Sequence, residues 1–130
     1  MELGNFENGI EKHADDIRGS IKSSGMYVRH ENNFSYTVGF AEIGLPELVV
    51  ELLPPSHAEE LFQTLMVAAR RDRQRSVTWL NLGRTLSPEP SFSELADQQR
   101  KQVFLDARTG YGHWDFRANL IQLPSRANAQ

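Results

Sequence analysis

The residue type best suited to chemistry in this sequence is arginine, which is concentrated just after the middle of the chain. Four arginines fall within six residues, at Arg70, Arg71, Arg73 and Arg75. Each guanidinium can donate two parallel hydrogen bonds to a phosphate or a carboxylate. This basic segment, residues 70–75, therefore predicts a site for an anion.

Aromatic side chains and a further arginine follow the basic segment in the same half of the chain. Trp79, Tyr111 and Trp114 could stack on a planar anion that Arg84 helps to neutralise. Together with the four arginines, these residues form the predicted ligand-binding set. The simpler alternative is that the arginines end a helix and keep it hydrated, while the tryptophans anchor the core.

A histidine and an aspartate form a second candidate group. His113 and Asp115 are two residues apart near an expected strand, where side chains at that spacing share a face. They could form an acid–base pair, or part of a metal site, with His30 or Tyr36 joining from the sheet. One pair does not fill the coordination sphere of a metal, so we predict no metal site. Exposed polar residues without a shared role are the simpler interpretation.

A third arrangement involves Ser35 and Thr37, which lie on the small-residue face of an expected strand. Glu47 could approach this face across the sheet and, with a histidine, complete a Thr–Glu–His site. Ordinary sheet residues explain the same pattern. Tyr36 lies on the opposite, apolar face, where a buried hydroxyl needs a hydrogen-bond partner.

Missing residues and motifs exclude several mechanisms. The chain has no cysteine, which removes disulfides, thiol nucleophiles and thiolate zinc sites. The glycine-rich phosphate loops, the nucleophile elbow and the His-Glu-x-x-His motif are also missing from the sequence. We therefore expect no cofactor, and the sequence favours binding over catalysis.

Charge is distributed unevenly, although the net charge of the 130 residues is only −3. Residues 1–65 carry 4 basic and 11 acidic side chains, whereas residues 66–130 carry 10 basic and 6 acidic ones. An acidic chain of this kind does not suit extended nucleic acid as a partner. The asymmetry fits a local anion site, contact between acidic and basic faces of two copies, or plain solvation.

Hydrophobic periodicity predicts the elements that must position these residues. A helix is expected from Ile10 to about Ser24, ending at Gly25. A hairpin of strands at 26–30 and 34–40 follows, and then a buried strand at 47–53. Ser56 and Glu59 begin a helix that continues to about Arg71. The remaining expectations are a strand at 77–82, a helix from Ser91 to Thr109-Gly110 and a last strand at 116–123.

This order, αβββαβαβ, predicts a single α+β domain over residues 1–130. One mixed or antiparallel sheet of about five strands should carry two to three packed helices, and residues 125–130 are expected to fray. No apolar run approaches the roughly 20 residues that span a bilayer. The acidic start without an apolar stretch is no signal peptide, so we predict a cytoplasmic protein without a membrane partner.

One stretch resembles a bacterial domain family of unknown function. The residues that carry the resemblance are Tyr36-Thr37-Val38-Gly39-Phe40 and Pro46-Glu47-Leu48-Val49-Val50. The later segment Leu120-Ile121-Gln122-Leu123-Pro124 is similar to the closing strand of that family. The resemblance implies a bacterial or phage origin and supplies no established reaction.

Three functions remain open at this point. The first is a small non-catalytic module that binds a nucleotide-like ligand or an acidic protein surface through the ligand-binding set. The second is an interaction domain that pairs with another copy or caps a different protein, including an accessory or inhibitor role. The third is a small hydrolase or transferase that uses His113 and Asp115.

Overall fold

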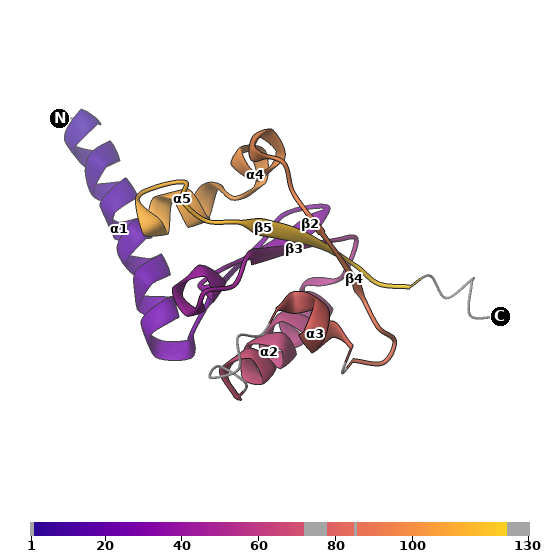
Figure 1. Ribbon diagram of the computed structural model, residues 1–130. Helices are drawn as coiled ribbons and strands as arrows, with labels where there is room; N and C mark the ends of the chain where they lie inside the picture. The colour runs from indigo at the N-terminus through magenta and orange to yellow at the C-terminus, as the bar shows by residue number, and fades with distance from the viewer. Residues whose placement is uncertain (1, 72–77, 85, 125–130) are drawn as a thin grey trace.

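The computed structural model describes residues 2–71, 78–84 and 86–124, and the side chains within these ranges from residue 11 onward. Arg73, Arg75 and the tail at 125–130 lie outside the described residues. Figure 1 shows a sheet with helices on both of its faces. The described helices are α1 (Glu2–Ser24), α2 (Pro55–Arg71), α3 (Trp79–Gly83), α4 (Asp97–Val103), α5 (Leu105–Tyr111) and the 3₁₀ helix η1 (Phe40–Ile43). The described strands are β1 (Tyr27–His30), β2 (Phe34–Val38), β3 (Glu47–Glu51), β4 (Ser91–Glu94) and β5 (Ala118–Gln122).

The five strands form one mixed sheet in the order β1-β2-β3-β5-β4. Neighbouring strands are antiparallel except for β3 and β5, which run parallel with Glu47 opposite Ala118. The chain between β3 and β5 must therefore cross over the sheet, which it does through helices on both faces. The predicted α+β class and single mixed sheet are confirmed.

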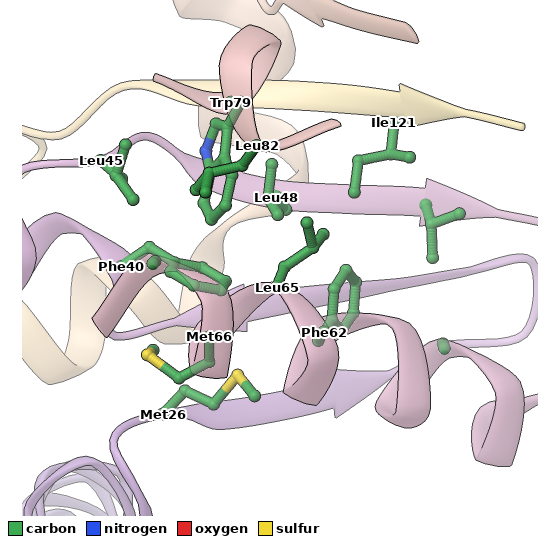
Figure 2. Close-up of a cluster of buried hydrophobic side chains, with 13 residues drawn as sticks. Met26, Phe40, Leu45, Leu48, Phe62, Leu65, Met66, Trp79, Leu82 and Ile121 are labelled. Atoms are coloured by element: carbon green, nitrogen blue, oxygen red, sulfur yellow. The ribbon is translucent and has the colours of Figure 1, made fainter. Parts of the chain in front are cut away.

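Alternating side chains send one set of residues to each face of the sheet. Leu48 and Val50 in β3 pack with Phe62 and Leu65 of α2 and with Trp79 of α3. Figure 2 shows these side chains of α2 and α3 turned toward the strands. The small residues Ser35 and Thr37 of β2 face this same side, so a helix packs closely there.

The opposite face is covered by α1, α4 and α5. Val49 of β3 packs there with Tyr36 and Val38 of β2, Ile17 of α1 and Phe104 beside α5. Gly110 of α5 touches α1 so closely that an added Cβ would lie 2.7 Å from Ile17 Cγ2. Among the described helices, none is both long enough and apolar enough to cross a membrane.

Two predicted elements are wrong in type. The segment expected as a strand at 77–82 is the helix α3 in its described part, because Trp79 and Leu82 are three residues apart and both turn inward. The Thr78 side chain accepts a hydrogen bond from Asn81 N and caps this helix. Conversely, Ser91 does not begin a helix, because residues 91–94 pair with β5 as strand β4.

Several boundaries also differ from the expectation, including the ends of β3 at Glu51 and of β5 at Gln122. Helix α1 starts at Glu2 instead of Ile10, and it ends as predicted at Gly25, whose φ is 95° and whose N–H bonds to Ile21 O. Strand β2 stops at Val38, because Gly39 has a φ of 140° and turns the chain into η1. Phe40 therefore packs against Trp79 on the α2 side and not beside Tyr36.

Candidate functional site

A fully buried glutamate lies at the start of β3. Glu47 has 0% of its surface exposed. An ionised side chain is almost never buried in this way unless other groups stabilise it. Hydrogen-bond donors around the Glu47 carboxylate must therefore compensate for its burial.

Five donors surround the Glu47 carboxylate. The hydroxyl of Thr37 donates to Oε1 at 2.9 Å, and the Tyr111 hydroxyl donates to Oε2. The remaining three are consecutive backbone N–H groups at the beginning of η1, those of Gly39, Phe40 and Ala41, at 2.9–3.1 Å. The carboxylate therefore caps η1 at its N-terminal end, where the helix dipole favours a negative charge.

Burial raises the pKa of Glu47 above its ordinary value, whereas the hydroxyls of Tyr111 and Thr37 and the N–H groups of Ala41 and Gly39 act in the opposite direction by stabilising the charged form. Burial and the neighbouring carboxylate also raise the pKa of Tyr111, so its phenol keeps its proton and donates it. We call Thr37, Gly39, Glu47 and Tyr111 the buried knot. It holds together β2, η1, β3 and α5.

The buried knot explains most of the motif noted in the sequence. Thr37, Gly39 and Glu47 belong to it, and Phe40 N donates to the same carboxylate. A glycine is required at position 39 for two reasons. Its φ is positive, and an added Cβ would lie 2.5 Å from Gly25 O. The predicted approach of Glu47 to Thr37 is confirmed, although no histidine takes part. The arrangement is structural, because its polar groups are buried and satisfy one another.

A cleft of about 410 Å³ opens beside the buried knot. Its walls are the residues that immediately precede the parallel strands β3 and β5, together with one residue of η1 and one of α4. These residues are Ala41, Gly44, Leu45, Pro46, Arg100, Trp114, Asp115, Phe116 and Arg117. A hydrogen bond from Glu47 N to Arg117 O, 2.8 Å long, joins the two wall segments. The size falls in the range of about 300–1,000 Å³ that small-molecule sites occupy.

Arg100 is the most constrained cation of this cleft. Its guanidinium lies over the Phe116 ring, with Cζ 5.6 Å from the ring centroid. Nη1 donates to Phe116 O at 2.9 Å, and Nη2 lies 3.1 Å from Asp97 Oδ1. Nε is buried and has no hydrogen-bond partner within the described ranges. A buried donor without a partner is rare in a folded protein and asks for an explanation.

The other polar groups of the cleft are more exposed. Arg117 pairs through Nε with Glu94 at 2.8 Å, and both side chains are more than half exposed, so water screens the pair. Trp114 is half-buried and packs against Phe116. Asp115 is exposed, and among the described residues its one hydrogen bond is from its backbone N–H to Nδ1 of His113. The cleft thus combines two guanidinium groups, one carboxylate and an indole.

The structure separates the members of the predicted ligand-binding set. Arg70 is exposed at the end of α2, with its guanidinium over Gly25, and Arg84 is exposed at the end of α3. Arg71 lines a different hollow of about 540 Å³ on the outer side of α2, beside Val67 and Leu86. Of the described members, Trp114 alone lines the cleft.

The two other aromatic members of the set have internal roles. Trp79 is buried between Phe40 and Phe92, and its indole N–H donates to Pro46 O at 2.8 Å. Figure 2 shows its ring inside the cluster that covers the sheet. The Tyr111 hydroxyl is committed to Glu47. Neither ring is free to stack on a ligand. Trp79 instead supports the cleft wall through its hydrogen bond to Pro46, which lines the cleft.

The proposed acid–base residues do not converge. His113 and Asp115 are exposed and contact each other only through a ring nitrogen and a backbone N–H. His30 bonds to Ser35 Oγ at 2.8 Å and to Glu59 Oε1 at 2.9 Å, on the α2 side of the sheet. In the described part of the chain, no three histidine, aspartate or glutamate side chains form a group that could hold a metal ion.

A polar cluster that the sequence pattern did not reveal lies at the first turn of α5. Asp106 accepts from the Tyr27 hydroxyl at 3.0 Å and bonds to His13 Nε2 at 2.9 Å. Its own N–H donates to the Tyr36 hydroxyl at 3.2 Å, which supplies the partner expected for that buried phenol. Because the three partners come from α1, β1 and β2, a sequence without long-range contacts gives no sign of the cluster. It fastens α1 to the domain.

Comparison with known proteins places the chain in a family. No curated protein and no solved structure matches it. The family described as "Domain of unknown function (DUF4262)" matches residues 21–129. This range contains the whole sheet, the buried knot and the cleft, whereas most of α1 precedes it. Since the match covers most of the sequence, the chain belongs to the DUF4262 family, a family of unknown function.

Proposed function

We propose that this protein is a non-catalytic module that binds a small anionic ligand in the cleft lined by Arg100, Trp114 and Arg117. The observation that carries the proposal is the state of Arg100. Its side chain lines the cleft with 14% of its surface exposed, and an aromatic ring, a carbonyl and a carboxylate hold its guanidinium in place. A cation that is already fixed in position can receive an anion without further ordering.

The rest of the cleft supports the same function. Arg117 is a second cation whose exposed ion pair with Glu94 costs little to break. Trp114 and Phe116 give an aromatic wall against which a planar or apolar part of the ligand can pack. The buried knot and the Trp79 bond to Pro46 hold the opposite wall in place. Such a preformed site loses little conformational entropy on binding.

Thermal shift and calorimetry at low ionic strength test the proposal. Inorganic phosphate, adenosine monophosphate and 3-phenylpropionate serve as anionic probes, and a ligand that binds the native state raises its Tm. We expect at least one probe to bind the unmodified protein. Arg117→Gln and Trp114→Ala should each weaken that binding about tenfold, since a charged hydrogen bond or an aromatic contact is worth roughly 1–3 kcal/mol.

Matched variants separate the cleft from the basic segment. Arg108 is exposed on α5 and does not line the cleft, so Arg108→Gln should leave binding unchanged. If Arg70→Gln with Arg71→Gln abolishes binding while Arg117→Gln does not, the ligand sits at the basic segment and the cleft proposal is wrong. No binding of any probe would also count against it.

A further inference from the structure

The cleft lining also contains a negatively charged side chain, that of Asp115. The carboxylate of Asp115 has no hydrogen bond or ion pair with any described residue. Its neighbour Trp114 has an indole N–H that is likewise unpartnered in the described part of the chain. The cleft lining therefore combines N–H donors on Arg100, Arg117 and Trp114 with a carboxylate acceptor on Asp115.

A ligand with only negative charge leaves this acceptor unused and is repelled by it. Like charges a few ångströms apart near a protein surface repel each other, and salt screens this repulsion only in part. A ligand that also has an ammonium group turns the repulsion into attraction. Asp115 lies two residues before Arg117, so the two charged side chains can reach ligand groups that are a few ångströms apart.

We propose that the ligand is a small zwitterion of the α-amino-acid type, and this inference rests on the proposed function. Its carboxylate lies against Arg100 and Arg117, its ammonium group against Asp115, and its side chain against Trp114 and Phe116. The volume of about 410 Å³ leaves room for an amino acid with a large apolar side chain. The mixed charge of the lining gives selectivity over simple acids, because the uncompensated Asp115 carboxylate disfavours them.

Calorimetry with matched ligands tests this charge pattern directly. L-phenylalanine is compared with 3-phenylpropionate, which lacks the amine, and with 2-phenylethylamine, which lacks the carboxylate. L-leucine and 4-methylpentanoate form a second pair, so that the outcome does not depend on one side chain. In at least one pair, we expect the amino acid to bind at least tenfold more tightly than the matched acid, and the free amine to bind more weakly than the amino acid.

Substitution of Asp115 then tests whether its carboxylate causes the preference for the amino acid over the matched acid. Asp115→Asn should abolish the preference for the amino acid while leaving, or improving, the affinity for the matched acid. Asp16 is exposed on α1, so Asp16→Asn serves as the control and should change nothing. Neither exchange removes a hydrogen bond of the fold, so both variants should unfold at the temperature of the unmodified protein.

The outcomes distinguish this inference from the proposed function. If the acids bind as tightly as the amino acids, the zwitterion proposal is wrong and the anion site stands. If phosphate or adenosine monophosphate binds in the cleft and no amino acid does, the same conclusion follows. If the cleft binds none of the probes, both proposals fail together.

Discussion

The hydroxyl of Thr37 in β2 donates a 2.9 Å hydrogen bond to the buried carboxylate of Glu47 at the start of β3, and accepts another from Leu48 N at 3.0 Å. One side chain thereby satisfies two buried polar groups where the two strands separate. The same carboxylate caps η1 and receives the Tyr111 hydroxyl. Ala41 and Arg117, which line the cleft, are both hydrogen-bonded to Glu47 and are thereby held in place.

Removal of the Thr37 hydroxyl tests the buried knot most simply. Thr37→Val keeps the shape of the side chain but leaves Leu48 N without its acceptor and Glu47 without one donor. We expect a loss of about 2 kcal/mol in the free energy of unfolding, because an orphaned buried polar group costs roughly 1–3 kcal/mol. Urea unfolding followed by circular dichroism measures this loss.

Thr37→Ser is the matched control for that experiment. It retains the hydroxyl and removes only one buried methyl group, which is worth about 1 kcal/mol. The serine variant should therefore be the more stable of the two. The reverse order would show that the methyl group matters and the hydrogen bonds do not.

The titration of Glu47 should make the free energy of unfolding depend on pH. Burial raises the pKa of Glu47 above its ordinary value of 4.5, so the folded chain holds this proton more tightly than the unfolded chain. The resulting stabilisation is fully present below the pKa of the unfolded chain, and is lost as the pH rises through the raised pKa of the folded chain.

Glu47→Gln isolates this contribution because the amide does not titrate. Its NH₂ group would face backbone donors, so we expect the variant to be less stable at neutral pH by about 3 kcal/mol. The stability difference between the unmodified protein and the variant should shrink as the pH rises from about 4. Urea midpoints at a series of pH values give the difference, and a difference that grows with pH would contradict the raised pKa.

The attachment of α1 depends on a close approach at Gly110. Gly110→Ala would place a Cβ 2.7 Å from Ile17 Cγ2, and this overpacking should destabilise the protein by about 1–3 kcal/mol. Gly19 offers the control, since a Cβ there meets nothing within 4 Å in the middle of α1. Gly19→Ala should instead stabilise by up to about 1 kcal/mol. Equal effects of the two substitutions on Tm would argue against this packing of α1.

Local patterns in the sequence predict much of this fold. The stripe of Ala14, Ile17 and Ile21 with Gly25 at its end predicts α1, and Ser56 with Glu59 predicts the beginning of α2. The apolar run at 47–53 predicts a strand covered on both faces, and the structure has this strand at 47–51, with residues 47–50 buried. The α+β class follows from the order of these elements.

The errors occur where distant partners decide the structure. Ser91–Glu94 contains one apolar residue, Phe92, and becomes a strand because β5 pairs with it and Trp79 packs against its ring. A strand at 77–82 would complete a crossover unit after α2, but the three-residue spacing of Trp79 and Leu82 fits the helix that forms there. The start of α1 is a different kind of error, because a local signal exists for it. Leu3 and Phe6 continue the apolar spacing of Ile10 toward the N-terminus.

The candidate site was predictable only in part. Trp114 was identified from its place in the basic half of the chain, and it lines the cleft. Arg100 was missed because a single arginine in a polar helix has no local signal, and its importance comes from Phe116, sixteen residues later. The four arginines at 70–75 predict an anion site by their number alone. A cavity, however, is formed by the folding of the chain and not by its composition.

The central claim is that small anions bind in the cleft, and a two-dimensional ¹⁵N NMR titration locates the site directly. Addition of 3-phenylpropionate or adenosine monophosphate to the labelled protein should shift the Trp114 indole signal and the amide signals of residues 41–45, 47 and 114–117, while the amide signals of α2 do not change. Shifts confined to the end of α2 and to α3, or no shifts at millimolar ligand, would contradict the assignment of the cleft.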